Sequence, residues 1–293
     1  MNIIKERAAA KINLYLDVLH RNEDGFHAIK TVMHSVDLSD TVIIKKLPAK
    51  EKKITLYVKN SRFLPHDDKN LAYRAAEMFL TRAKIDSSVE IVLIKHIPVS
   101  AGLAGGSSDA AAVLRGLNKL FGKPFTAKML YKIAAELGSD VPYCVYGKTA
   151  LCEGRGEIMT LLPDKLKLYA VVAIAKERMS TPIAYSELDK LYSNFDGSVN
   201  SEGEKHFKKI MESVESGVFS ADGLYNIFEK PVLPLCKRAG EIKEKLLSLG
   251  AVASLMSGSG PSVFGIFESE NAAQAACRAL AADNVYALAC KSI

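Results

Sequence analysis

Hydrophobic residues along the chain follow two periods, and the change from one to the other separates predicted strands from predicted helices. Between residues 10 and 18, apolar and polar residues alternate, which predicts a strand with Lys11 and Asn13 on the face away from the core. Residues 89–97 are rich in β-branched side chains and predict another strand. Apolar residues then recur at the helical period over 108–121. A glycine-rich stretch therefore lies between a strand and a helix.

The same two patterns predict the other elements of the chain. A surface loop is expected over residues 192–204, which are rich in Ser, Asn, Gly and Asp. A hairpin over 149–162 closes a first domain, residues 1–162, and leaves residues 163–293 as a second. Further strands are expected at 41–47, 54–58, 166–175, 252–256, 263–267 and 285–289, with helices from 67, over 126–137, from 181 and over 271–282.

Composition narrows the class of protein. The 293 residues are 48% hydrophobic and 25% charged, which is typical of a globular protein large enough for two domains. The longest apolar run, residues 168–175, is too short to span a bilayer, and charged residues 5–7 stand where a signal peptide needs an apolar core, so we expect a cytoplasmic protein. Five cysteines without Cys-x-x-Cys spacing argue against a disulfide framework and a zinc site.

The net charge of +6 leaves two kinds of partner open. The basic residues form no long run and no RNA-binding signature. Attraction to phosphorylated small molecules therefore accounts for the charge as well as nucleic-acid binding would. We expect neither a nucleic-acid nor a membrane partner, and the sequence sets no oligomeric state.

The glycine-rich stretch, residues 98–108, reads Pro-Val-Ser-Ala-Gly-Leu-Ala-Gly-Gly-Ser-Ser and is called the glycine loop below. Gly102, Gly105 and Gly106 allow positive φ and leave no Cβ against a ligand, so several N–H groups can point into one concavity. Either final serine can cap the following helix, whose N-terminus favours an anion. Neither Gly-Lys-Ser nor Gly-x-Gly-x-x-Gly spacing is present, so the loop is an unusual polyphosphate site or a flexible connection.

The glycine loop resembles the phosphate-binding signature of the GHMP kinases, the superfamily of galactokinase, homoserine kinase and mevalonate kinase. Residues 10–14 and residues 257–262 resemble the first and third motifs of that superfamily, although 257–262 alone is also a glycine turn between strands. The resemblance implies an α+β protein, with a first domain like ribosomal protein S5 domain 2 and a ferredoxin-like second domain. It also implies that ATP, accompanied by Mg²⁺, is bound by Asn70, Lys95, Pro98, Val99, Ser100, Ala101, Gly102, Leu103, Ala104, Gly105, Gly106, Ser107 and Ser108.

The same resemblance assigns roles in catalysis. It implies that Lys11 assists the reaction and that Asp140, within Gly-Ser-Asp-Val-Pro, accepts the proton of the substrate hydroxyl. From the residues alone, Lys11 is equally a solvated lysine beside a strand. Without the resemblance, Asp140 is better explained as a turn-capping aspartate, because Pro142 disfavours a helix at the residue before it.

One predicted ATP-binding residue, Asn70, also allows a structural interpretation. Asn70 stands near the start of a predicted helix, where asparagine is a common N-cap. Ser108, the last residue of the glycine loop, and Asp109 directly after it are near enough in sequence to be considered as ligands of Mg²⁺, but the sequence assigns no metal ligand.

Residues 24–27, Asp-Gly-Phe-His, resemble the Asp-Gly-Tyr-His of the diphosphocytidyl kinases, a branch of the superfamily. The resemblance implies a small-molecule cytidine diphosphate substrate whose cytosine is recognised by Phe26, His27 and Tyr185. Phenylalanine keeps the stacking face but lacks the hydroxyl of tyrosine. His27 is equally a structural histidine and Tyr185 a partly buried core residue. Further substrate contacts are implied for Asn13, Gly258, Ser259 and Gly260.

Two alternative functions stay open. Another GHMP kinase would share the glycine loop but would need no cytosine site. A nucleotide-binding or RNA-binding module would follow from the S5-like fold and the net charge, and it would bind RNA in a salt-sensitive way without consuming ATP.

Overall fold

The computed structural model describes residues 2–49, 53–177, 179–192 and 201–293, and its backbone forms two compact units. The long strands β1 (Ile3–Arg21) and β2 (His27–Leu47) contribute residues to both units. Because the two units are not consecutive stretches of the chain, they do not test the predicted division after residue 162, which stays a prediction. Unit 1 comprises Met1–Ala10, Ser39–Val99 and Ala104–Gly147, and unit 2 comprises Lys11–Leu38, Ser100–Leu103 and Lys148–Ile293.

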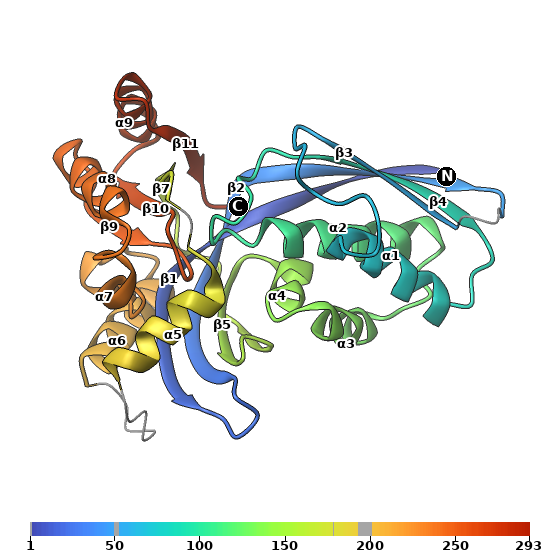
Figure 1. Cartoon of the computed structure of the whole chain (residues 1–293), viewed down its shortest axis with the longest axis horizontal. Helices are drawn as coiled ribbons and strands as arrows, with labels where there is room; N and C mark the ends of the chain where they lie inside the picture. The colour runs from blue at the N-terminus through green and yellow to red at the C-terminus, as the bar shows by residue number, and fades with distance from the viewer. Residues whose placement is uncertain (1, 50–52, 178, 193–200) are drawn as a thin grey trace. The chain divides into compact units, whose positions relative to one another are not determined.

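Unit 1 is a sheet with helices beside it. Strand β4 (Ser88–Ile94) is antiparallel to the second half of β2 and parallel to β3 (Ile54–Lys59). The helices pack with one another along this sheet, as Figure 1 shows. They are α1 (Leu71–Arg82), α2 (Gly105–Leu120), α3 (Ala127–Leu137) and α4 (Val141–Tyr146). Small buried side chains let α1 and α2 approach closely, namely Ala72, Ala75, Ala76, Ala110, Ala111 and Ala112.

An antiparallel sheet in unit 2 has the strand order β11-β7-β10-β9. Its strands are β7 (Tyr169–Ile174), β9 (Ala253–Met256), β10 (Val263–Phe267) and β11 (Tyr286–Lys291). Helix α8 (Lys237–Ser248) packs on β9 and β10, and α9 (Glu270–Ala282) packs on β7 and β11. With the elements between β7 and α8 set aside, the order β7-α8-β9-β10-α9-β11 is the strand-helix-strand-strand-helix-strand order of a ferredoxin-like fold.

The rest of unit 2 surrounds the second half of β1 and the first half of β2. Strand β5 (Thr149–Gly154) pairs with β2 and forms the predicted hairpin with β6 (Ile158–Leu161), while β8 (Tyr225–Asn226) runs parallel to β1. The helical segments are α5 (Thr181–Leu191), α6 (Ser201–Ser216), α7 (Glu229–Val232) and a 3-10 turn at Ala221–Gly223.

Several boundaries differ from the sequence prediction; for example, helix α1 begins at Leu71 and not at residue 67, and β4 ends at Ile94 and not at residue 97. Helix α2 begins at Gly105, so both serines of the glycine loop lie inside its first turn instead of capping it. Asp140 directly precedes a short helix, α4, because Pro142 fits the first turn, where a missing N–H costs nothing. Of the loop predicted over 192–204, residues 193–200 lie outside the described residues. Residues 201–204 are helical, with Glu202 and Glu204 favouring the N-terminus of α6.

In the part of the chain that the structure describes, no helix is long and apolar enough to cross a membrane. The expected cytoplasmic location stays a prediction. All five cysteines are thiols, and each except Cys277 is buried, which agrees with a packing role.

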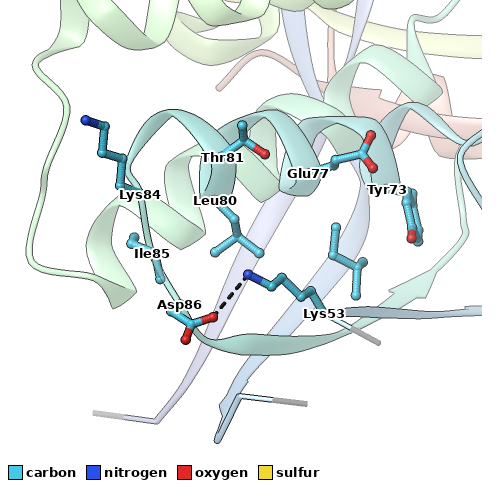
Figure 2. Close-up of a pocket in the computed structure, with 9 residues that line it drawn as sticks. Lys53, Tyr73, Glu77, Leu80, Thr81, Lys84, Ile85 and Asp86 are labelled. Carbon is cyan, nitrogen blue, oxygen red and sulfur yellow. Dashed lines mark hydrogen bonds and ion pairs between the residues drawn. The ribbon is translucent and has the colours of Figure 1, made fainter. Parts of the chain in front are cut away.

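A pocket of about 770 Å³ lies in unit 1 between the start of β3 and helix α1. Figure 2 shows Lys53 pointing to Asp86 at this pocket, with 3.1 Å between Lys53 Nζ and Asp86 Oδ1. The other side of the pocket is formed by α1, including Tyr73 and Glu77. None of the nine described residues that line it was predicted as a site residue. This pocket is therefore not the site that the sequence predicts.

Candidate active site

Parts of the three motif segments singled out by the sequence, residues 10–14, the glycine loop and residues 257–262, meet within unit 2. The Lys11 backbone N–H donates to the carbonyl of Leu103 in the glycine loop, at 3.2 Å. Ser257 Oγ donates to the carbonyl of Gly102, also at 3.2 Å. A Cβ added to Gly258 would lie 3.6 Å from Lys11 Nζ. The first strand, the tip of the glycine loop and the turn after β9 therefore lie side by side.

Gly102 is required at this meeting point. Its φ is +69°, and a Cβ there would lie 2.3 Å from the carbonyl oxygen of Ser257, closer than any real contact. Asn226 holds the opposite segment in place, because its amide nitrogen donates to the carbonyls of Met256 (2.7 Å) and Gly258 (2.8 Å). The close approach of two backbone segments thus depends on one glycine and one buried asparagine.

Lys11 and Asn13 are buried, so the solvated strand face predicted for them is wrong. Their exposed fractions are 4% and 2%, because residues 10–18 of β1 are covered on both faces. Lys11 Nζ donates to Asn13 Oδ1 at 2.6 Å, and Asn13 Nδ2 donates to the hydroxyl of Thr31 at 2.9 Å. A buried ammonium costs much less free energy when it is hydrogen-bonded in this way.

The glycine loop is shaped to bind an anion. Ser100, Gly102 and Ala104 all have positive φ, and such alternation turns successive N–H groups to one side. Ala104 caps α2 in the left-handed conformation, without a side-chain hydrogen bond. The first N–H groups of a helix have no partner within it, and Gly106 among them is exposed. The N-terminus of α2 can therefore accept phosphate oxygens.

A buried ion cluster in unit 1 supports the start of the loop. Lys95 Nζ donates to one carboxylate oxygen each of Asp40 and Asp109. The other oxygen of Asp40 accepts the backbone N–H groups of His96 and Ile97, which directly precede the loop. Burial raises the pKa of Asp109, whereas the charge of Lys95 opposes that rise. The Lys95 ammonium thus serves these carboxylates, and its contact with a nucleotide stays a prediction.

The two candidate metal ligands have other partners. Ser108 Oγ donates to the carbonyl of Ala9, and Asp109 is held by Lys95. Its second oxygen, Asp109 Oδ1, is buried without a hydrogen-bond partner in the described residues. No cluster of three or more His, Cys, Asp or Glu side chains able to hold a metal ion occurs in the ranges that the structure describes.

Asn70 and Asp140 both stand at the start of a helix in unit 1. Asn70 Oδ1 accepts the N–H of Ala72 at 3.0 Å, and its amide nitrogen donates to the carbonyl of Pro65, so the N-cap interpretation is confirmed. The side chain of Asp140 makes no cap hydrogen bond. Its backbone carbonyl instead accepts a hydrogen bond from the N–H of Cys144, in the first turn of α4.

The residues predicted to recognise cytosine gather in unit 2. The rings of His27 and Tyr185 stack with centroids 4.7 Å apart. Phe26 is 56% exposed, and the guanidinium of Arg155 lies 4.0 Å from the centre of its ring. His27 Nε2 lies 2.7 Å from Asp189 Oδ1. An exposed aromatic ring beside a buried, hydrogen-bonded imidazole provides both a stacking face and polar groups for a heterocycle.

The third motif contacts α5 at one further point. Ser259 Oγ lies 3.0 Å from Thr181 Oγ1 at the first residue of that helix. Gly260 has a φ of +80°, and a Cβ there would lie 2.4 Å from Met256 Sδ. The Gly258 to Gly260 turn therefore needs glycine for its own folding, whatever it binds.

Comparison with known proteins places this geometry in a family. Models of the N-terminal and C-terminal domains of GHMP kinases match residues 70–148 and 207–286. The chain is 40% identical over 280 residues to a 4-diphosphocytidyl-2-C-methyl-D-erythritol kinase of Macrococcus caseolyticus (strain JCSC5402), with 95% of each chain covered. The chain belongs to the 4-diphosphocytidyl-2-C-methyl-D-erythritol kinase family.

Other members of this kinase family and related structures agree. The relative in Gloeobacter violaceus (strain ATCC 29082 / PCC 7421) is 41% identical over 284 residues, covering 97% of this chain and 92% of its own. A crystal structure of 4-(cytidine 5'-diphospho)-2C-methyl-D-erythritol kinase is 32% identical, with a TM-score of 0.82 over 98% of both chains. A homoserine kinase from Cytophaga hutchinsonii, 22% identical with a TM-score of 0.78, shares the fold. The expected GHMP kinase fold is confirmed.

Membership of this kinase family also confirms the expected use of ATP. The N-terminal model covers Asn70, Lys95, the glycine loop and Asp140, whereas the third motif falls within the C-terminal model. Lys11 belongs to unit 2 and Asp140 to unit 1. Their roles, and those of the other site residues, stay predictions.

Several residues at the site escaped the sequence analysis. Thr31, Asp40 and Asn226 are ordinary polar residues in strands, and nothing local marks them. Asp189 had a usable signal, because it follows Tyr185 by four residues on a predicted helix and so shares its face. Arg155 stands in the turn between β5 and β6, where a charged residue is commonplace.

Proposed function

We propose that this protein transfers the γ-phosphoryl group of ATP to the 2-hydroxyl of 4-diphosphocytidyl-2-C-methyl-D-erythritol. The products are the 2-phosphate and ADP, in the non-mevalonate route to isoprenoid precursors. Relatives of that name share about 40% identity over nearly the whole chain. The observation that carries the proposal is the meeting of Lys11, the tip of the glycine loop and Gly258 within unit 2.

The glycine loop is proposed to bind the phosphates of ATP. Its positive-φ residues and the N-terminus of α2 offer several N–H groups and a positive helix dipole. No side chain at Gly105 or Gly106 keeps an oxygen away. Asn70 and Lys95 are proposed to lie beside the bound nucleotide. Lys95 would act indirectly, because its ion cluster with Asp40 and Asp109 holds the backbone directly before the glycine loop.

Phosphoryl transfer spreads negative charge over the oxygens of the moving group, so its catalysis is mostly positioning and electrostatic stabilisation. Asp140 is proposed to accept the proton of the substrate hydroxyl. Lys11 is proposed to neutralise charge in the transition state and to favour the ionised form of that carboxylate. The hydrogen bond from Lys11 Nζ to Asn13 Oδ1 suits this role because it orients a charged group before substrate arrives.

Mg²⁺ is expected to accompany ATP and would neutralise phosphate charge. Ser108 Oγ donates its proton to the carbonyl of Ala9 and Asp109 Oδ2 accepts from Lys95, so these contacts do not single out either side chain as its ligand. We therefore assign no protein ligand to the ion.

The cytidine end of the substrate is proposed to lie at Phe26, His27 and Tyr185. Stacking on the exposed Phe26 ring and hydrogen bonding to His27 would recognise the base. Asn13 and the turn formed by Gly258, Ser259 and Gly260 would contact the remainder of the substrate.

ADP release against a panel of GHMP alcohol substrates tests the proposal. Turnover is expected with the diphosphocytidyl substrate and not with mevalonate or homoserine, and CMP or CDP should compete with the substrate. Turnover with mevalonate or homoserine that CMP does not inhibit would assign another GHMP kinase activity. Salt-sensitive RNA binding without ATP consumption would point to a binding module.

The Asp140→Asn variant tests the mechanism. General-base catalysis contributes about 10²–10⁴-fold, so kcat should fall by that order with little change in ATP affinity. A purified variant with nearly full kcat would remove Asp140 from proton transfer.

A further inference from the structure

Thr31 is a buried residue of β2 that the proposed mechanism leaves unused. Its side chain is completely inaccessible. Thr31 Oγ1 lies 2.6 Å from the backbone carbonyl oxygen of Tyr15 and 2.9 Å from Asn13 Nδ2. Asn13 Oδ1 in turn lies 2.6 Å from Lys11 Nζ. One hydroxyl thus begins a chain of hydrogen bonds that ends at the proposed catalytic lysine.

The direction of each hydrogen bond in this chain follows from chemistry. A carbonyl oxygen only accepts, so the single hydroxyl proton of Thr31 is directed to Tyr15. Towards Asn13 the hydroxyl can only accept, and the amide must present its NH₂ group to Thr31. The amide oxygen of Asn13 must then face Lys11 Nζ, which has protons to donate and no lone pair when charged. Thr31 therefore decides which way round the Asn13 amide stands.

We propose that Thr31 is a positioning residue, which fixes the amide of Asn13 so that its oxygen holds Lys11 Nζ beside Gly258. The proposal rests on the proposed function in one respect, namely that Lys11 acts in phosphoryl transfer. The hydrogen-bond directions do not depend on it.

Loss of the hydroxyl should disturb Lys11 and leave the binding residues in place. In Thr31→Val the buried NH₂ group of Asn13 loses its acceptor, while the side-chain shape is nearly kept. If the amide rotates to find another partner, it turns NH₂ toward an ammonium, which repels it. If it does not rotate, the acceptor of Lys11 remains but is no longer held in one orientation. The glycine loop and the residues at the cytosine end are untouched in both cases.

Steady-state kinetics of matched variants test the proposal. Thr31→Val should lower kcat about tenfold, the equivalent of one hydrogen bond to a charged group, with both KM values nearly unchanged. Thr31→Ser keeps the hydroxyl and should restore most of kcat. Thr149→Val is the control, because Thr149 is equally inaccessible in unit 2 and its hydroxyl hydrogen-bonds His34 instead of Asn13. It should lose stability without losing kcat.

Other outcomes would overturn the proposal. A purely structural role predicts that Thr31→Val and Thr149→Val lower the urea midpoint alike and leave kcat of the folded enzyme unchanged. Failure of Thr31→Ser to restore kcat would show that the hydroxyl is not what matters. If Thr31→Val does not fold, Thr31→Ala removes the same hydroxyl without adding a poorly fitting methyl.

A second measurement separates this proposal from the proposed function. The side-chain amide resonance of Asn13 in ¹⁵N-labelled protein, assigned by its absence in Asn13→Asp, should exchange with water faster in Thr31→Val than in the unsubstituted protein. An exchange rate unaffected by Thr31→Val refutes the hydrogen-bond order whatever the enzyme phosphorylates. Faster exchange in a protein that releases no ADP would leave the hydrogen-bond order intact and refute the proposed function.

Discussion

Gly106 offers a test of whether the glycine loop is shaped by folding or by a ligand. It is the second residue of α2 and is exposed, and its φ is not positive. A Cβ there would meet only Leu71 Cδ1, at an ordinary 3.8 Å. Folding therefore does not require glycine at this position. Because alanine is the better helix former, Gly106→Ala should raise the free energy of unfolding by up to about 1 kcal/mol.

The same methyl group should weaken ATP binding. If a phosphate oxygen approaches the first N–H groups of α2, a Cβ at position 106 stands in its way and weakens one charge-assisted hydrogen bond. Such a bond is worth about 1.5–3 kcal/mol, so the Kd for ATP should rise roughly 10-fold to 150-fold. Stability and affinity are thus expected to change in opposite directions.

Two other glycines provide the comparison. Gly240 lies in α8, and a Cβ there meets nothing within 4 Å, so Gly240→Ala should give a similar gain in stability with no change in ATP affinity. Gly102→Ala should instead destabilise the protein, by more than about 1–2 kcal/mol, because it combines positive φ with a clash against the Ser257 carbonyl.

The assay is calorimetric titration with ATP and urea unfolding of the three variants under one set of conditions. A Gly106→Ala variant that is more stable and binds ATP as tightly as the unsubstituted protein would refute the reasoning. The N-terminus of α2 would then not be the phosphate site.

Two further predictions concern buried charge. Lys95→Met leaves two buried carboxylates, Asp40 and Asp109, without their cation. It should lower the free energy of unfolding, measured in urea titrations, by about 3–5 kcal/mol. A loss below about 1 kcal/mol would mean that the two carboxylates do not depend on Lys95. Burial raises the pKa of Asp17 from 3.8 to about 6, so its ionisation opposes folding increasingly as pH rises through that range. Asp17→Asn should therefore stabilise the protein by about 1 kcal/mol more at pH 7.5 than at pH 5, and an equal effect at both pH values would contradict the assignment.

The glycine loop shows how far local sequence reaches. Its strand-loop-helix order was predicted from the residues, because hydrophobic period is a local property. Of the three glycines expected to allow positive φ, only Gly102 has it, because Gly105 and Gly106 lie in α2. The first residue of α2 was not predicted. Ala104 takes the left-handed conformation that the sequence favours for glycine, and the hydroxyl of Ser108 is used by the carbonyl of Ala9, which is 99 residues distant. A cap prediction cannot include a partner that only the tertiary fold supplies.

The strand holding Lys11 shows the same limit for burial. Alternation correctly predicted the strand but assigned its polar face to solvent, although other parts of the fold cover that face. Family resemblance, not periodicity, singled out Lys11. The partners that make its burial tolerable, Asn13 and through it Thr31, depend on where β2 lies beside β1. The alternating pattern does not fix that placement.

Each of the three motif segments is held by a buried side chain from outside the motif. Asp40 accepts two backbone N–H groups directly before the glycine loop, Asn226 donates to two carbonyls of the third segment, and Thr31 orients Asn13 beside Lys11. The two glycine-containing segments have little conformational preference of their own, so such contacts must supply the order that phosphoryl transfer needs. Substitutions at these three supports should therefore change rates without touching a ligand, whereas the glycines they hold should act mainly through binding or backbone strain.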